Sequence, residues 1–460
     1  MTYDPIKTRQ KGFTASERYT AELCRKSFLS LWSYPNIFRD QKLGGKGDGK
    51  EIADVIAVFG NDILLFSDKN CSFPSAKIDV SWRRWYKRAI HNSVKQLRGA
   101  ERWLREYPNR VFLDSKCEQM LPIGIPSQEK ARYHHIIVAS GAGEACRNFF
   151  GEGSGSLMLC PDFPTPLDES PNRELAGTPF VIGSSYGANV HVLDDATLPI
   201  IMRELDTVSD FVDYLIRKSR FIENGHLSVS AGEEHLLAYY LTHVFAKGQS
   251  DFPNPPKGRK LGLDESLWPG LSSEEWFISF KKQLRPSYYW DKIIQLLSED
   301  ILNSKMIAGN ENGIAGHERR VRALASAPRR IRLGRSLALI ELIGNDDYPT
   351  RFRSIRHQYQ PDTAYLFLVL KRDGLGEKDY RETRSKLMQA YVLSFSYHNP
   401  DVRHVIGFST GPSSDGDDTS HEVVYLDRAE WSDEHERLAL LGQNLFGIYQ
   451  DVRKKSTWVE

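Results

Sequence analysis

The sequence lacks the features that mark several large classes of protein. Its 460 residues contain no apolar run long enough to span a bilayer, and the first residues lack the apolar segment of a signal peptide. The chain has neither a Walker A motif nor a Gly-x-Gly-x-x-Gly motif. A membrane protein, a P-loop nucleotide hydrolase and a dinucleotide-dependent enzyme are therefore not expected.

Cysteine is sparse, and neither sign of charge dominates. The five cysteines, at positions 24, 71, 117, 146 and 160, form no Cys-x-x-Cys pair, which predicts the reduced thiols of a cytoplasmic protein and no zinc site. The formal net charge is only +1. Its distribution is uneven, because residues 1–110 hold 21 Lys and Arg against 12 Asp and Glu. A local basic excess of this kind favours binding to a polyanion.

Length and hydrophobic pattern predict an α/β protein with several domains. A chain of 460 residues with 40% apolar content is long enough for two or three separate cores. Alternating strand and helix patterns predict an α/β domain over residues 1–196. Helical spacing dominates residues 197–345, and a strand-helix-strand pattern predicts a small α/β domain over residues 346–460.

The most informative segment is a predicted β-hairpin. Apolar runs at 55–59 and 63–66 flank a turn of Gly60, Asn61 and Asp62. Asp54 precedes the first run, while Asp68 and Lys69 end the second, so folding brings these side chains within reach. Carboxylates bind Mg²⁺ or Mn²⁺, and a nearby ammonium group orients water or offsets charge on a phosphoryl group. The pattern predicts metal-dependent phosphodiester hydrolysis; the plainer alternative is a solvated ion pair at a strand end.

The hairpin resembles that of the PD-(D/E)XK, or restriction-endonuclease-like, nuclease superfamily, whose motif reads Asp, a spacer, then acid-x-Lys. Asp54 matches the first acid and Lys69 the lysine, but Ser67 stands where the second acid belongs. Asp68 comes one residue late and points to the opposite face of a regular strand. Either a bulge turns Asp68 towards Asp54, or the second acid comes from elsewhere in the chain.

The resemblance extends over roughly the first 140 residues and implies a central mixed β-sheet flanked by helices. The family order is helix, three-stranded meander, helix, strand. Helical spacing over 14–33 and 82–107 and a strand at 134–140 follow that order. Family members often add a Glu from the first helix and a Gln from the second. The resemblance therefore implies catalytic and metal-site roles for a set of candidates: Asp54, Asp68, Lys69 and Gln96 as catalytic residues; Asp54, Asp68 and Glu22 as metal ligands; and Glu17 or Glu101 as substitutes for the missing acid.

Glu51 is a secondary candidate, because strict alternation along a strand puts it on the face opposite to Asp54. Two basic clusters are further candidates for nucleic-acid contact. In the first, residues 82–88, the spacing favours a buried Trp82 and Trp85 with Arg and Lys facing solvent. The second, residues 319–335, fits a nucleic-acid grip, an acidic partner or a solvated helix surface.

These features together predict a Mg²⁺- or Mn²⁺-dependent endonuclease that acts on DNA, with RNA left open. By analogy with nucleases that carry a large appendage, an effector role in prokaryotic anti-phage defence is expected. Residues 197–460 are expected to bind a partner protein or a second copy of the chain, and no membrane. Two alternatives stay open: a catalytically degenerate nuclease fold that binds nucleic acid or a partner, and a scaffold subunit without hydrolytic activity.

Overall fold

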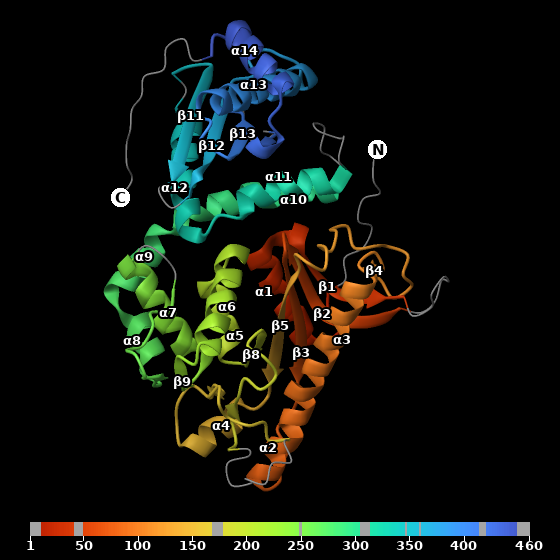
Figure 1. Cartoon of the computed structure of the whole chain (residues 1–460), viewed down its shortest axis with the longest axis vertical. Helices are drawn as coiled ribbons and strands as arrows, with labels where there is room; N and C mark the ends of the chain where they lie inside the picture. Colours follow the sequence, from red (N-terminus) through yellow and green to blue (C-terminus); the bar gives the residue numbers. More distant parts are fainter. Residues whose placement is uncertain are drawn as a thin grey trace. The chain divides into compact units, whose positions relative to one another are not determined.

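The computed structural model describes residues 11–40, 49–167, 178–247, 251–303, 313–345, 347–357, 360–413 and 420–448. The chain forms two compact units, one ending at Lys282 and the other beginning at Gln283 (Figure 1). Both units combine helices with mixed β-sheets. None of the helices in the described ranges has the length and apolar character that a bilayer crossing requires.

The first unit is built around a six-stranded mixed sheet with strand order β4-β1-β2-β3-β5-β8. Strands β1, β2 and β3 form an antiparallel meander, and β3 pairs in parallel with β5, which pairs in parallel with β8. The elements that form this sheet and cover it are α1 (Ala15–Trp32), β1 (Ser33–Arg39), β2 (Lys50–Phe59), β3 (Asp62–Asn70), α2 (Ile78–Tyr86), the π-helical turn η1 (Lys87–His91), α3 (Asn92–Glu106), β4 (Val111–Phe112), β5 (Arg132–Ser140) and β8 (Val190–Leu193).

The hairpin and its covering helices lie where the sequence predicts them. Strands β2 and β3 meet at a turn in which Gly60 has a φ of 62°, a conformation that glycine adopts without strain. Helix α1 starts with a capping box, in which Thr14 accepts the N–H of Glu17 and the Glu17 carboxylate accepts the N–H of Thr14. The predicted order of helix, meander, helix and strand is therefore present.

Helices α1 and α3 cover opposite faces of the meander. Phe66 of β3 contacts Phe28 of α1, with ring centroids 6.1 Å apart. Its neighbour Ser67 points the other way and hydrogen-bonds Ser93 of α3. On the α2–α3 side, Trp82 and Trp85 are fully buried, as the sequence predicts. The middle residues of β2 and β3 are thus buried between two helical layers, and exposed residues occur only at strand ends.

The remainder of the first unit packs beside this core. A small four-stranded sheet has the order β10-β9-β6-β7. Helix α5 joins the α1 layer, since the Ser27 hydroxyl donates to the Met202 carbonyl oxygen at 3.2 Å. The elements are α4 (Gly143–Phe150), β6 (Met158–Leu159), β7 (Val181–Ile182), α5 (Thr197–Glu204), α6 (Val208–Glu223), β9 (Leu227–Ser230), α7 (Glu233–Lys247), β10 (Leu261–Leu263), α8 (Leu267–Ser273) and α9 (Glu275–Gln283).

The second unit is a three-layer α/β structure. Its four-stranded sheet has the order β11-β12-β13-β14, and β12 pairs in parallel with β13 across the crossover helix α13. One face of β12, including Leu366 and Leu368, packs on α13, while Phe367 on the other face contacts Trp290 of α10. The elements are η2 (Arg285–Ser287), α10 (Tyr288–Leu302), α11 (Gly313–Ala325), α12 (Arg329–Gly344), β11 (Thr350–His357), β12 (Gln360–Leu370), α13 (Glu377–His398), β13 (His404–Thr410), β14 (Glu422–Asp427), η5 (Arg428–Glu430) and α14 (Asp433–Phe446).

The structure divides the chain differently from the sequence pattern. Residues 197–345, expected to be a helical region of their own, are split between the two units at Lys282. The reason is burial: α5 packs on α1, whereas α10 and α12 cover one face of the C-terminal sheet. Helical periodicity reveals that a helix has an apolar face but not which sheet that face covers.

Candidate functional site

The candidate site lies at one end of the β2–β3 hairpin. Val55 pairs with Phe66, and continuing this antiparallel register by one residue places Asp54 opposite Ser67. Directly opposed residues in an antiparallel pair share a face, so Asp54, Ser67 and Lys69 all point to the α3 side. The Lys69 Nζ lies 3.5 Å from Asp54 Oδ2. The structure therefore brings together the first acid and the lysine of the predicted motif.

Asp54 is buried, with 2% of its surface exposed. Its Oδ2 accepts a hydrogen bond from the backbone N–H of Asp68 at 2.5 Å, and the same oxygen contacts the Lys69 ammonium group. Burial raises the pKa of Asp54, and the charges of Glu17 and Asp68 act in the same direction, against the lowering effects of Lys69 and the Asp68 N–H. A nearby positive charge stabilises the charged form of a buried carboxylate such as Asp54.

Glu51 shares the face of Asp54, contrary to the alternation expected from the sequence. Ile37 of β1 pairs with Ala53, but Phe38 pairs with Glu51, so Ile52 is the extra residue of a β-bulge. The bulge breaks the two-residue period and turns Glu51 to the Asp54 side. Burial raises the pKa of Glu51, and the charges of Asp54 and Glu17 raise it further. Glu51, a secondary candidate in the sequence, thus shares the face of the candidate site with Asp54.

Asn36 of β1 completes this side of the site. Its side-chain amide donates to Glu51 Oε1 at 2.6 Å, and Asn36 itself is fully buried. The Asn36 Oδ1 is buried without a hydrogen-bond partner among the described residues. An orphaned amide oxygen beside two carboxylates is a donor set that suits a hard cation.

Asp68 lies on the other face of the sheet, as an unbulged strand requires. Its Oδ1 accepts a hydrogen bond from the Ser16 hydroxyl at 2.6 Å and its Oδ2 accepts one from the Thr20 hydroxyl at 2.5 Å. Burial raises the pKa of Asp68, although these two hydrogen bonds lower it. The side chain fastens α1 to β3, and only its backbone N–H reaches Asp54. The expected role of Asp68 as the second acid does not fit this geometry.

Ser67 occupies the position of the missing acid. Its hydroxyl is fully buried and lies 3.2 Å from the Ser93 hydroxyl and 3.3 Å from Gln96 Oε1. Gln96 is therefore connected to the site through Ser67, as its predicted place on the second helix implies.

The other predicted acids lie elsewhere. Glu22 forms ion pairs with Arg25 and Lys26 on the outer surface of α1, so its predicted role as a metal ligand does not fit. Glu101 pairs with Arg105 and His135, and His135 lies beside Leu65, not beside Lys69. Glu17 of α1 is near enough for its charge to raise the pKa of Asp54, Asp68 and Glu51, but its carboxylate caps α1 by accepting the N–H groups of Phe13 and Thr14.

The charges at the site are unbalanced in a way that suits a divalent cation. Glu17, Glu51 and Asp54 contribute negative charge, and Lys69 contacts Asp54. Within the described ranges, no group of three or more His, Cys, Asp or Glu side chains is arranged to hold a metal ion. Mg²⁺, however, is commonly held by one or two carboxylates, with water and substrate phosphate completing its shell. Asp54 and Glu51 fit that kind of site, with the Asn36 amide oxygen beside them.

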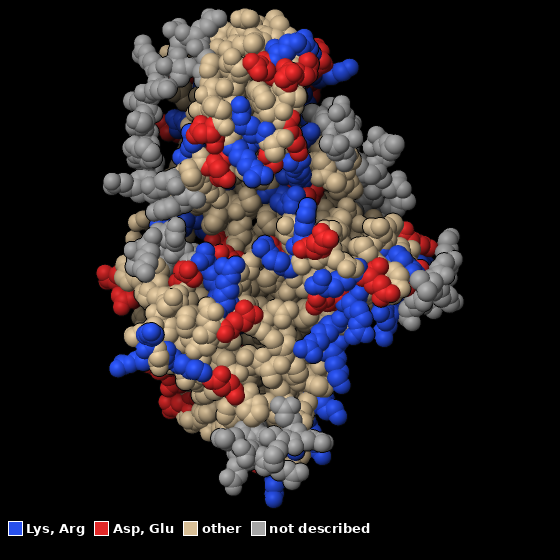
Figure 2. Space-filling view, in the orientation of Figure 1, with Lys and Arg blue, Asp and Glu red and all other residues tan. Residues whose placement is uncertain are grey.

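A basic surface follows the helix next to the site. Figure 2 shows blue atoms along the edge that α2 and α3 occupy in Figure 1. The exposed cations of this surface, here called the α2–α3 basic face, are Arg83, Arg84, Lys87, Arg88, Lys95, Arg98 and Arg102. Lys95 directly precedes Gln96, so the basic face adjoins the site. No protein-family model, curated protein or solved structure matches the chain.

Proposed function

We propose that the protein is a divalent-metal-dependent nuclease that hydrolyses phosphodiester bonds in DNA. The observation that carries the proposal is the shared face of Glu51, Asp54 and Lys69 at the end of the hairpin. The helix, meander, helix and strand around it follow the order of the PD-(D/E)XK superfamily. Buried carboxylates with raised pKa values beside a lysine are typical of catalytic sites.

Asp54 and Glu51 would hold the ion, with Mg²⁺ or Mn²⁺ supplying charge stabilisation and an activated water when bound. Lys69, whose side chain is 31% exposed, reaches solvent and contacts Asp54. Its ammonium group is placed to orient water and to offset charge on a phosphate. Gln96 holds Ser67 and thereby fixes the strand that carries Lys69.

The α2–α3 basic face supports a nucleic-acid substrate. Its cations stand on the outer side of a helix whose inner side, Trp82, Trp85 and Leu97, is buried. The helix is therefore held rigidly while its positive charges stay exposed to solvent, where they can meet phosphates. Because the aromatic rings face the core, they do not stack on bases, and the contact is expected to be with the backbone of the nucleic acid.

The direct test is cleavage of plasmid, linear double-stranded DNA, single-stranded DNA and RNA with Mg²⁺, Mn²⁺ or EDTA. Asp54→Asn keeps an acceptor for the Asp68 N–H but loses a direct metal ligand. Its cleavage rate should therefore fall further than the loss of about 10–100-fold that follows removal of a residue contacting the metal only indirectly. Lys69→Met should also lower it. Glu22→Gln is the matched control and should cleave like the wild type. Equal cleavage by wild type and both site variants would reject the proposal, and cleavage of RNA alone would reject DNA as substrate.

A second candidate is supported by Ser67 and the position of Asp68. With a serine in the acid position and Asp68 turned to α1, the same fold would serve as a nucleic-acid- or partner-binding subunit without hydrolysis. Calorimetric titration with Mn²⁺ separates the two candidates. A degenerate site would bind DNA through the basic face but show no Mn²⁺ binding that depends on Asp54. For the active enzyme we retain the proposed effector role in prokaryotic anti-phage defence, which rests on analogy.

A further inference from the structure

An exposed aromatic ring lies at the edge of the candidate site. The Phe13 side chain, just before α1, is 58% exposed, more than any other phenylalanine or tryptophan in the described ranges. Single exposed apolar side chains are common on protein surfaces, so the exposure alone has no functional meaning. What distinguishes Phe13 is its position.

Two contacts place Phe13 beside the proposed metal ligands. Its ring centroid lies 6.5 Å from that of Phe38, a buried residue of β1 that pairs directly with Glu51 of β2. Directly opposed residues of an antiparallel pair hold their side chains close together, so a single side chain separates Phe13 from Glu51. The Phe13 N–H also donates to Glu17 Oε2 at 2.7 Å, and the charge of Glu17 raises the pKa of Glu51.

The Phe13 ring keeps a face open and has cations near it. Its plane makes an angle of 74° with that of Phe38, an edge-to-face contact that leaves at least one face of Phe13 uncovered by Phe38. Lys11 stands two residues before Phe13, Lys50 directly precedes Glu51, and both lysines are exposed. Proteins that bind single-stranded nucleic acid use this combination, because bases stack on the ring while cations hold the phosphates.

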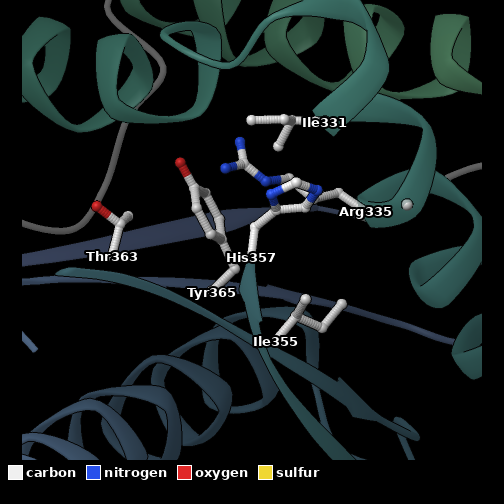
Figure 3. Close-up of a pocket in the computed structure, with 7 residues that line it drawn as sticks. Ile331, Arg335, Ile355, His357, Thr363 and Tyr365 are labelled. Atoms are coloured by element: carbon white, nitrogen blue, oxygen red, sulfur yellow. The ribbon is translucent and has the colours of Figure 1, made fainter. Parts of the chain in front are cut away.

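The α12 part of the second basic cluster offers no comparable surface. Arg329 and Arg332 are buried, and each lies 2.6 Å from an oxygen of Asp291. Arg335 is 2% exposed and lines a cavity of about 30 Å³ beside Tyr365, which has room for about two atoms and not for a base (Figure 3). These three arginines are therefore internal, and neither a solvated surface nor a nucleic-acid grip describes them.

We propose that Phe13 is a substrate-contacting residue that stacks on an unpaired base of single-stranded DNA at the edge of the metal site. A protein ring can stack only on a base that has left the continuous stack of a duplex. The place of Phe13 beside Glu51 sets that base close to the phosphate at the ion. The inference rests on the proposed function and narrows its substrate class to DNA with unpaired bases at the site.

The test is a fluorescence titration of the full chain, in EDTA so that no hydrolysis occurs, with a short single-stranded DNA that carries 2-aminopurine. The fluorescence of this base falls when it stacks on an aromatic ring, so one titration reports both the contact and the affinity. We expect saturable quenching by the wild type. Phe13→Leu keeps an apolar contact with Phe38 but has no ring, so it should bind about five- to 150-fold more weakly and lose most of the quenching.

Two further variants separate stacking from a structural role. Phe13→Trp restores a ring and should bind and quench like the wild type. Tyr19→Leu is the matched control, because it removes a comparably exposed ring, 51% exposed, from the outer side of α1, where Tyr19 shares a helix face with Glu22. This control should bind the single strand like the wild type. A blunt duplex of the same sequence should bind equally to the wild type and to Phe13→Leu.

Several outcomes would overturn the inference. They are wild-type binding and quenching by Phe13→Leu, an equal loss of single-strand binding in Tyr19→Leu, and an equal loss of duplex binding in Phe13→Leu. A lower melting temperature of Phe13→Leu with unchanged binding would show that the ring packs within the protein instead. Should Phe13→Leu not fold, absence of quenching in the wild type and Phe13→Trp would overturn it.

The proposed nuclease function fails separately. Its failure is the absence of Mg²⁺- or Mn²⁺-dependent cleavage by the wild type, whereas the fluorescence titration requires neither metal nor cleavage. A wild type that cleaves DNA while Phe13→Leu binds the single strand equally well would reject only the role of Phe13.

Discussion

The sharpest prediction compares two glutamates that differ in their place in the structure. Glu51→Gln should abolish most Mn²⁺ binding, whereas Glu22→Gln should leave it intact. Glu51 shares the Asp54 face because of the bulge at Ile52, and Glu22 is paired with Arg25 and Lys26 on the surface of α1. The same chemical change is thus made inside and outside the proposed site.

The magnitude follows from linkage. At an ion concentration ten times its dissociation constant, binding stabilises the folded unit by about 1.4 kcal/mol. For a unit that extends from Pro5 to Lys282, this stabilisation raises the melting temperature by about 3–6 °C. If Glu51→Gln weakens binding by about 10–100-fold, as loss of a metal-site group does, the stabilisation at the same concentration falls below about 0.4 kcal/mol.

Without metal, the two variants should behave differently again. Burial raises the pKa of Glu51, so its charged form is disfavoured in the folded protein, and Gln can still accept the Asn36 amide. Glu51→Gln should therefore melt at or above the wild-type temperature. Glu22→Gln loses only exposed ion pairs, a change of less than about 1 kcal/mol.

The assay is differential scanning calorimetry with and without Mn²⁺, with the melting temperature as the readout. A full Mn²⁺ shift in Glu51→Gln would show that Glu51 is not part of the metal site. Loss of the shift in Glu22→Gln would show that the α1 surface holds the ion. No shift in the wild type would reject the metal proposal altogether.

The remaining predictions concern Asp68, pH and the basic face. Asp68→Ala should destabilise the protein by about 3 kcal/mol, because two hydrogen bonds to a buried carboxylate are lost and Thr20 is left unpaired. Urea unfolding measures this loss, and an unchanged unfolding midpoint would show that Asp68 does not hold α1 against β3. The folded-state pKa values of Glu51, Asp54 and Asp68 are raised. Metal-free stability from these groups is therefore fully present below their unfolded pKa values and is lost as pH rises through the folded ones. Mn²⁺ should reverse the part of that loss that comes from Glu51 and Asp54, the two proposed metal ligands. Melting temperatures measured across pH 4–8, with and without Mn²⁺, test the direction of this pH dependence. A metal-free protein whose stability rises with pH would contradict the prediction. The double variant Lys95→Gln/Arg102→Gln should weaken DNA binding. The slope of the logarithm of the binding constant against the logarithm of salt concentration should become shallower by about 0.9 per lost phosphate contact. Lys386→Gln, an exposed position in the second unit, is the control and should bind DNA like the wild type.

Local patterns predicted much of the first unit because the relevant forces act over short distances. The turn at Gly60, the capping box of α1 and the burial of Trp82 and Trp85 all follow from spacing along the chain. The proximity of Asp54 and Lys69 follows as well, because a tight hairpin fixes its own register. These predictions required no knowledge of any distant partner.

The choice of acids required the pairing of separate strands. The bulge at Ile52 arises where β1 pairs with β2, and nothing in the order of residues from Glu51 to Asp54 announces it. Asp68 likewise takes its role from Ser16 and Thr20, which reach it from a different helix. A polar residue that could have indicated the site is Asn36, which lies in the middle of β1 between Pro35 and Ile37.

The sequence by itself determined that the chain contains α/β architecture, a hairpin with Asp54 and Lys69 at its end, and a helix with one basic face. Tertiary structure alone decided that Glu51 joins Asp54, that Asp68 fastens α1, and that Arg335 is buried without an acid while Arg329 and Arg332 share Asp291. The physical reason is that periodicity assigns a side chain to a face of its own element. Which charges meet across elements depends on non-local pairing and burial, and these set the electrostatics of the proposed nuclease site.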